Sequence, residues 1–263
     1  MMKKIKLVIA YDGTDFSGFQ AQPGQRTIQG TLQEVLTRIT GEPIEIYGSG
    51  RTDAGVHALG QVCHFETTSP IPADKYPFIL RRSLPKDIIV MSAEEAAPDF
   101  HARKSAFWKT YRYQTENHRI PNLFERRFRT HLPYEVDLAA MGRAARYLIG
   151  THDFTSFCSA KTVIEDRVRT LYRCEVGEDG RGFFIEVTGN GFLYNMVRII
   201  AGTLYEVGRG KIDPDQIPAI LDGRDRRLAG PTFPPEGLIL LEVGYRPWKD
   251  FSSVKNGFSP WGS

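Results

Sequence analysis

The residues best suited to chemistry lie in residues 48–57, which read GSGRTDAGVH. Three glycines and a Ser-Thr-Asp cluster stand here between two segments of strand-like pattern. Glycine permits backbone conformations that are closed to other residues and lets a ligand approach the chain closely. Loops held by a rigid scaffold also carry many catalytic and binding residues. The segment therefore predicts a functional loop, and the alternative is a long hairpin connection in which Asp53 caps a turn.

A second polar cluster, Tyr11-Asp12-Gly13-Thr14, follows a strand-like segment. It faintly resembles the Asp-x-Asp-Gly-Thr motif of haloacid-dehalogenase-type phosphatases, in which the first Asp is the nucleophile. Ala10 occupies that position here, so the covalent chemistry is absent and a strand-to-loop turn is favoured. A phosphohydrolase built on Asp12 remains as an alternative hypothesis.

The sequence shows no metal-binding motif. No HExxH pair or other ligand spacing occurs among the histidines, at positions 57, 64, 101, 118, 131 and 152. Cys63, Cys158 and Cys174 form no CxxC pair, so neither a thiolate zinc site nor a disulfide framework is predicted. P-loop and nucleophile-elbow signatures are also absent from the sequence. We therefore expect no metal.

Positive charge is concentrated in one segment of the chain. The 263 residues include 34 Lys and Arg against 31 Asp and Glu, but residues 101–131 alone carry an excess of six. Six aromatic residues are interleaved with the basic ones. Cations attract phosphates and aromatic rings stack on unpaired bases, so the segment favours single-stranded or loop RNA. The alternative is a strand with core aromatics and solvated basic residues. The RNA-binding candidates are Arg103, Lys104, Lys109, Arg126 and Arg127.

Arg198 stands in an apolar stretch, residues 195–200 (NMVRII). A buried guanidinium is costly unless a carboxylate pairs with it. The flanking residues Ile199 and Ile200 favour some burial, so we expect an acidic partner for Arg198. The alternative is an edge position with an exposed guanidinium.

The first half of the chain predicts the elements that must position these residues. Apolar residues alternate over the strand at 3–10 and follow a helical stripe over 27–40, which Gly41 terminates. The predicted order is strand, helix, strand, strand, helix, strand, which is the ferredoxin-like pattern. The remaining elements are strands at 43–47, 60–66 and 87–92 and a helix at 74–84.

The second half predicts the same order of elements. Asp137 can cap a helix, and residues 178–180 form the turn of a predicted hairpin. The predicted strands are 105–115, 167–176, 182–188 and 238–243, and the helices are 138–148 and 193–207, with a small extra helix at 214–221.

The predicted fold class is therefore α+β, with two tandem ferredoxin-like (βαββαβ) units at residues 1–100 and 101–246. Abutting along their edges, the two sheets would form one largely antiparallel continuous sheet of eight main strands with helices on one face. This arrangement would remove two exposed edges from solvent.

The sequence carries no recognisable targeting or membrane-spanning segment. Residues 1–5 lack the apolar run of a signal peptide, and no stretch approaches the roughly 18 apolar residues of a membrane span. We therefore expect a reduced, cytoplasmic protein. Residues 247–263 are rich in Ser, Gly and Pro, and we expect an irregular tail without an assigned role.

Taken together, the motifs resemble the TruA family of tRNA pseudouridine synthases, over about residues 3–245. The catalytic signature of that family is similar to residues 48–58 (GSGRTDAGVHA). Its other motifs are similar to residues 11–14, 16–20, 109–113, 150–154 and 192–198. No departure occurs at these motif positions.

The resemblance implies isomerisation of uridine to pseudouridine at tRNA positions 38, 39 and 40 in the anticodon stem-loop. It implies a homodimer without a metal or organic cofactor. Asp53 matches the essential aspartate, which acts as nucleophile, and Tyr111 matches the tyrosine that stacks on the target uracil. Arg51 resembles the residue that replaces the flipped base. Arg198 would pair with Asp53 and favour its ionised form, since burial alone raises the pKa of a carboxyl group.

A non-catalytic RNA-binding module is the main rival hypothesis, because ferredoxin-like sheets bind RNA through exposed aromatic residues. The loop around Asp53 separates the two hypotheses, because a pure binder needs no carboxylate in a basic cleft.

Overall fold

The computed structural model describes residues 2–249. The first part of the chain folds in the order strand, helix, two strands, helix, strand. These elements are β1 (Lys3–Tyr11), α1 (Ile28–Thr40), β2 (Tyr47–Gly48), β3 (His57–Thr67), α2 (Tyr76–Ser83) and β4 (Ile88–Ala96). Most of the predicted tail, residues 250–263, lies outside the described residues.

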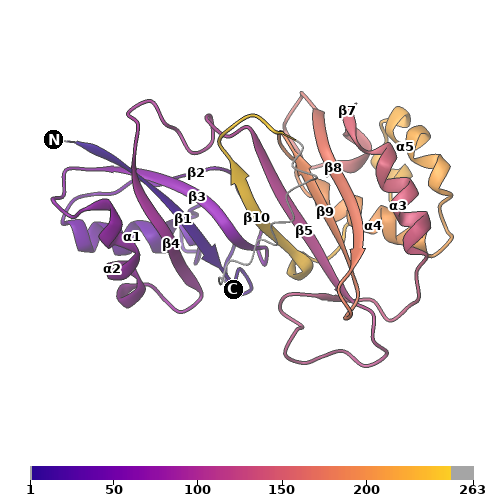
Figure 1. Cartoon of the computed structure of the whole chain (residues 1–263), viewed down its shortest axis with the longest axis horizontal. Helices are drawn as coiled ribbons and strands as arrows, with labels where there is room; N and C mark the ends of the chain where they lie inside the picture. Colours follow the sequence, from indigo (N-terminus) through magenta and orange to yellow (C-terminus); the bar gives the residue numbers. More distant parts are fainter. Residues whose placement is uncertain (1, 250–263) are drawn as a thin grey trace.

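The second part of the chain contains the same sequence of elements with additions. They are β5 (Trp108–Glu116), β6 (Thr130–His131), α3 (Leu138–Tyr147), β7 (Gly150–Asp153), β8 (Val168–Glu178), β9 (Phe183–Gly189), α4 (Met196–Gly208), α5 (Ile217–Gly223) and β10 (Leu238–Gly244). Figure 1 shows α1 and α2 beside the strands of the first part, and α3, α4 and α5 beside those of the second.

One ten-stranded sheet joins the two parts, with the path β4-β1-β3-β10-β5-β9-β8-β7. The first part has the order β4-β1-β3-β2 and the second has β10-β5-β9-β8, so the same topology occurs twice. Strand β3 makes the connection. Its residues Cys63 and His64 pair with β2, and His57 and Ala58 pair in parallel with β10. The predicted α+β class with a continuous, largely antiparallel sheet is confirmed.

Local sequence explains why α1 forms where it does. The Thr27 hydroxyl accepts a hydrogen bond from the Gly30 amide (3.2 Å) and caps the first turn. Gly41 ends the helix with φ 74°, in the left-handed region that favours glycine. Leu32 and Leu36 are fully buried on the face that packs on the core.

The predicted strand at 43–47 is wrong, because only Tyr47 and Gly48 pair with β3. Polar side chains of α1 replace the strand partners of the preceding residues. The Ile44 amide donates to the Thr37 hydroxyl and the Ile46 amide donates to the Gln33 side-chain oxygen, both at 3.1 Å. The apolar side chains are buried as predicted, but without a sheet ladder.

Helix α4 begins at Met196, three residues later than predicted. Asn195 adopts φ 62° and therefore cannot continue a right-handed helix into the preceding residues. The Met196 amide instead donates to the Leu193 carbonyl (3.1 Å), which closes a turn. The short strands β6 and β7 were also not predicted, since two to four residues carry too little alternation to be recognised.

Candidate active site

A cleft of about 1090 Å³ opens where the first and second parts of the sheet meet. It is lined by the loop before β3, by β5 and by three segments of the second part, residues 101–104, 161–164 and 192–197. Five lysines and arginines line it against a single carboxylate, that of Asp53. The five are Arg51, Arg103, Lys104, Lys109 and Lys161.

Asp53 and Arg198 form the predicted ion pair, with Arg198 Nη1 3.6 Å from Asp53 Oδ2. The guanidinium is also fixed from two other sides. Its Nε donates to the Phe233 carbonyl (2.6 Å) and its Nη1 donates to Asn195 Oδ1 (2.9 Å). The side chain of Arg198 is only 16% exposed, so the alternative of a solvent-exposed arginine is wrong. An arginine held by three groups is a fixed source of positive charge beside Asp53.

Burial controls the protonation of Asp53. Desolvation raises the pKa of the carboxyl group, Arg198 lowers it, and the net pKa lies above the usual value for Asp. We expected Arg198 to favour the ionised form, and its contribution has that sign. It does not fully offset burial, so the ionised carboxylate is held in an environment that disfavours it.

Tyr11 at the end of β1 and residues 18–19, which precede α1, fix the position of the Asp53 loop. The Tyr11 hydroxyl hydrogen-bonds the Thr52 hydroxyl (2.8 Å), and the Phe19 amide donates to the Thr52 carbonyl (3.0 Å). At Gly18, φ is 91° and an added Cβ would lie 2.8 Å from that carbonyl. Thr52 is thus fixed on both backbone and side chain, which determines where Asp53 projects.

The turn at Asp53 is closed by backbone atoms. The Val56 amide donates to the Asp53 carbonyl (3.1 Å), and Gly55 takes φ 78°. The carboxylate of Asp53 therefore does not cap this turn, as the alternative interpretation of the loop required. It faces the cleft and Arg198 instead.

Asp12 has a structural environment rather than a reactive one. Its Oδ1 accepts from the Thr14 amide (3.0 Å) and hydroxyl (2.6 Å) and lies 3.3 Å from His57 Nδ1. These hydrogen bonds contribute to a lowered pKa. Oδ1 is held within the turn and Oδ2 lies 3.4 Å from Arg127 Nη1, so the carboxylate is engaged by the fold, which disfavours the phosphohydrolase hypothesis.

Tyr111 lies on β5 and lines the same cleft. It is 8% exposed, and its ring meets that of Phe192 edge-on with centroids 5.1 Å apart. Burial raises the pKa of its hydroxyl, so the ring is presented in neutral form. Arg51 is exposed on the wall of the cleft, two residues before Asp53.

The basic candidates separate into two groups. Arg103, Lys104 and Lys109 line the cleft, whereas Arg126 and Arg127 are not among its lining residues. Arg127 Nη1 instead lies 3.2 Å from an Asp15 carboxylate oxygen and 3.4 Å from one of Asp12, and Arg126 donates to the Leu123 carbonyl. Other cations of this segment are paired too, with Arg112 on Glu186 and Arg129 on Asp179.

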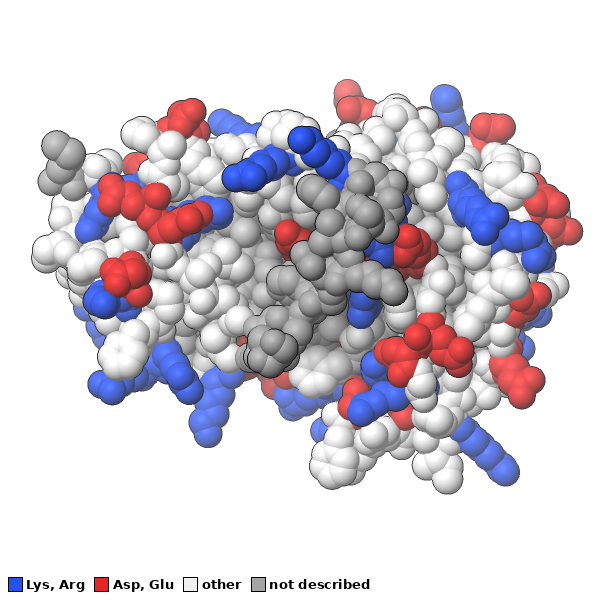
Figure 2. Space-filling view, viewed as in Figure 1, with Lys and Arg blue, Asp and Glu red and all other residues white. Residues whose placement is uncertain are grey.

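The charge excess of residues 101–131 therefore does not become one continuous basic field. Acidic residues far away in sequence neutralise part of it. On the face seen in Figure 2, lysines and arginines are interspersed with acidic residues. What remains positive is the cleft itself.

Sequence reasoning missed several lining residues of the cleft. Residues 161–164 form part of its wall, with Val163 94% exposed, and no pattern distinguishes them from an ordinary loop. Phe192 and Asn195 lie within a motif that was recognised, but their contacts with Tyr111 and Arg198 depend on tertiary structure.

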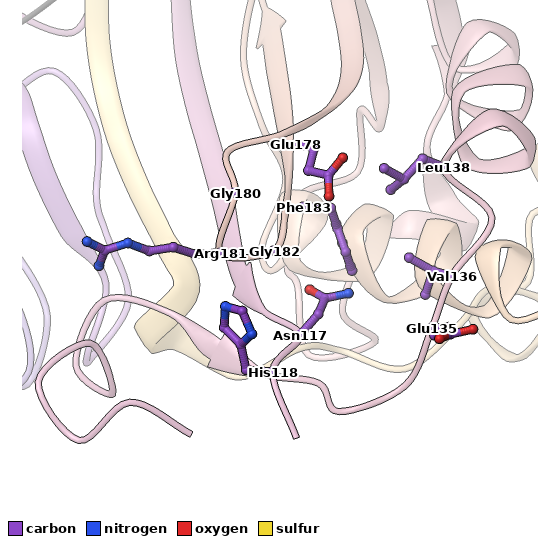
Figure 3. A pocket seen from close by; sticks show the side chains of 10 residues that line it. All are labelled: Asn117, His118, Glu135, Val136, Leu138, Glu178, Gly180, Arg181, Gly182 and Phe183. Carbon is purple, nitrogen blue, oxygen red and sulfur yellow. The ribbon is translucent and has the colours of Figure 1, made fainter. Parts of the chain in front are cut away.

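A second cavity, of about 350 Å³, lies between the turn joining β8 to β9 and the start of α3. Figure 3 shows Phe183 beside Asn117, while Arg181 extends away from the other labelled side chains. None of the site residues expected from the sequence lines it. Within residues 2–249, no three His, Cys, Asp or Glu side chains are grouped to hold a metal ion, and no helix is long and apolar enough to span a membrane.

A carboxylate beside a guanidinium and an aromatic ring, in a cleft rich in cations, is the arrangement expected of an enzyme that modifies RNA bases. The family model described as tRNA pseudouridine synthase matches residues 7–103 and 144–246. The chain belongs to this family and is an isomerase that acts on tRNA.

Curated relatives cover nearly the whole chain. The tRNA pseudouridine synthase A of Brevibacillus brevis is 52% identical over 93% of this chain and 100% of its own length. The enzyme of the same name from Geobacillus kaustophilus is 53% identical and covers 93% of this chain and 95% of its own length. The one from Bacillus subtilis is 48% identical and covers 92% of this chain and 99% of its own length. A chain of a solved Cbf5-Nop10-Gar1 complex has 12% identity and a TM-score of 0.36, covering 90% of this chain and 57% of that one, which is too low for further inference.

Proposed function

We propose that the protein converts uridine to pseudouridine at positions 38, 39 and 40 of the tRNA anticodon stem-loop, with Asp53 as nucleophile. The carboxylate attacks covalently, at either the ribose carbon or the uracil base, and the N-glycosidic bond breaks. The uracil then turns, its C5 bonds to the same ribose carbon, the bond to Asp53 breaks, and the proton on C5 is lost while the freed ring nitrogen takes one up. No redox step occurs and no group is lost. Because it acts on tRNA, the protein would work in the cytoplasm. The resemblance to the family also implies that it forms a homodimer.

The single observation that carries this proposal is the placement of Asp53. It is the one carboxylate among the described residues lining a cleft with five cations, and it is paired with a fixed arginine. A module that only binds RNA gains nothing from a negative charge in that position, because it repels phosphates. A nucleophile, in contrast, must lie inside the cleft, where the target base would bind.

The neighbouring residues have properties that suit the other roles. Extruding a stacked base costs on the order of a few kcal/mol, and stacking on an aromatic ring returns roughly 1–3 kcal/mol. Tyr111 offers a ring to the extruded uracil within the cleft. The exposed Arg51 is long enough to occupy the space that the base leaves. Arg103, Lys104 and Lys109 would contact the tRNA backbone.

The test is the Asp53→Asn variant, which keeps the size of the side chain and removes its nucleophilicity. We expect pseudouridine formation in unmodified tRNA to be abolished while tRNA binding survives, because the amide removes no cation from the cleft. Conversion is mapped at each nucleotide, which also tests positions 38–40. Retained conversion in this variant would falsify the role of Asp53, and conversion confined to other nucleotides would overturn the assignment of the stem-loop.

A further inference from the structure

Lys109 is unusual among the basic residues of the cleft. It lies on β5 two residues before Tyr111, so the two side chains lie on the same face of the strand, and both line the cleft. Its Nζ donates to the Ser49 carbonyl (2.8 Å). It also lies against Gly50, where an added Cβ would be 2.8 Å from Nζ. The ammonium group thus touches the loop that carries Asp53.

The charge of Lys109 has no carboxylate partner within residues 2–249. Arg103 is the charged group that acts on it directly, and the other charged or titratable groups lining the same cleft are Arg51, Asp53, His101, Lys104, Tyr111 and Lys161. Its strand neighbours, Gly189 on β9 and Val243 on β10, are uncharged. Burial, with a smaller contribution from Arg103, lowers the pKa of Lys109 to about 8.

A desolvated ammonium beside other cations is unfavourable unless an anion completes the site. Other cations of the same segment have such partners within the chain, since Arg112 Nη2 lies 2.7 Å from Glu186 and Arg129 Nη2 lies 2.6 Å from Asp179. An ammonium group has three donors, and the Ser49 carbonyl accepts one of them. The other donors remain for a ligand in the cleft.

We propose that Lys109 forms a phosphate subsite, in which Nζ binds the phosphodiester next to the target uridine while it holds the Ser49 carbonyl. Binding of the RNA backbone is thereby coupled to the position of the Asp53 loop. A phosphate is favoured over a base carbonyl, because a neutral acceptor does not compensate the buried charge. This inference rests on the proposed function.

The direct test uses unmodified tRNA assembled with a single methylphosphonate, which is uncharged, at each linkage around the target uridine. With the unaltered enzyme, one linkage should lower kcat/KM by about tenfold or more, as expected for a charge-assisted hydrogen bond. With Lys109→Met, kcat/KM on normal tRNA should already be reduced by a similar factor, and the same linkage should add no further loss. The Lys211→Met variant is the matched control, because Lys211 pairs with Glu206 outside the cleft.

The protonation of Lys109 provides an independent readout. The ammonium is charged below its pKa of about 8 and neutral above it. The kcat/KM of the unaltered enzyme should therefore fall as the pH rises above about 8. Lys109→Arg retains its charge at all these pH values and should remove this alkaline limb. It also keeps a donor for Ser49, so it tests the subsite if Lys109→Met does not fold.

Three results would overturn the subsite. The first is that the reductions in kcat/KM caused by Lys109→Met and by the methylphosphonate multiply when both are present. The second is that no single methylphosphonate linkage lowers kcat/KM of the unaltered enzyme. The third is that Lys109→Arg still loses activity as the pH rises above about 8. Each of them can occur while the unaltered enzyme still forms pseudouridine. If the unaltered enzyme forms none in normal tRNA, the proposed function itself has failed.

Discussion

Asp53 is subject to two opposing effects on its charge. Burial raises the pKa of its carboxyl group, and Arg198 at 3.6 Å lowers it, with burial dominant. A nucleophilic carboxylate must be ionised, so the acid limb of activity should lie above the range of an exposed Asp, whose pKa is about 3.9. The burial that raises this pKa therefore makes the proposed nucleophile harder to ionise.

The Arg198→Met variant tests this opposition. Removing the guanidinium leaves burial uncompensated, so the pKa of Asp53 rises further and the acid limb of kcat/KM moves to higher pH. Arg198→Lys keeps a positive charge and should shift the limb less. The measurement is a single-turnover pH profile of pseudouridine formation. An unchanged profile and rate in Arg198→Met would show that the ion pair has no catalytic role.

At the scale of single residues, the sequence predicted a contact where burying a charged side chain without a partner would cost much free energy. Arg198 in an apolar stretch predicted an acidic partner, and the structure places Asp53 there, far away in sequence. The same reasoning gave no partner for Arg127, which pairs with Asp12 and Asp15 outside the cleft lining. A basic residue in a basic segment gives no indication of which distant carboxylate will neutralise it.

At the scale of elements, the turn after β1 and the loop before β3 form one unit. The Gly13 amide donates to His57 Nδ1 (3.1 Å), and an added Cβ at Gly13 would lie 2.0 Å from the Val56 carbonyl oxygen. Backbone therefore packs directly on backbone. The motif that resembled a phosphatase nucleophile serves to position the loop of Asp53.

Gly13→Ala should consequently reduce kcat strongly, by about tenfold or more, since small displacements of reacting groups are costly to rate. The backbone of the Asp53 loop has to move to admit the methyl group. Gly142→Ala is the control, because a Cβ there meets nothing within 4 Å in α3, and alanine there should be neutral or stabilising. Kinetics and thermal unfolding of both variants separate lost rate from lost fold. Full activity in Gly13→Ala would disprove the positioning role.

The elements were predictable where periodicity is long. Strand β1 and helices α1 and α3 match their predicted ranges closely, because alternation or a helical stripe continues over many residues. The strand expected at 43–47 failed, since side chains of α1 satisfy its backbone amides. Apolar spacing predicts burial there, but it does not show which group accepts the hydrogen bonds.

At the scale of the whole molecule, the junction of β3 with β10 brings the two halves of the candidate site together. Asp53 comes from the first part, while Tyr111 and Arg198 come from the second. Element order predicted a continuous sheet but did not specify which strands join. The length of β3 allows β2 and β10 to pair with different residues along the same strand.

Gly60 in β3 makes this junction possible and gives the strongest test of it. An added Cβ there would lie 2.3 Å from the Leu241 carbonyl oxygen of β10, so the two strands must separate. Gly60→Ala should therefore shift Asp53 relative to Tyr111 and reduce kcat by about tenfold or more, while tRNA binding changes less, because the cations remain. The control is Gly177→Ala in β8, where the three atoms nearest to the added Cβ all belong to the ring of Phe184. That variant should lose stability without a comparable loss of kcat. If Gly60→Ala and Gly177→Ala lower kcat equally, the junction does not align the site.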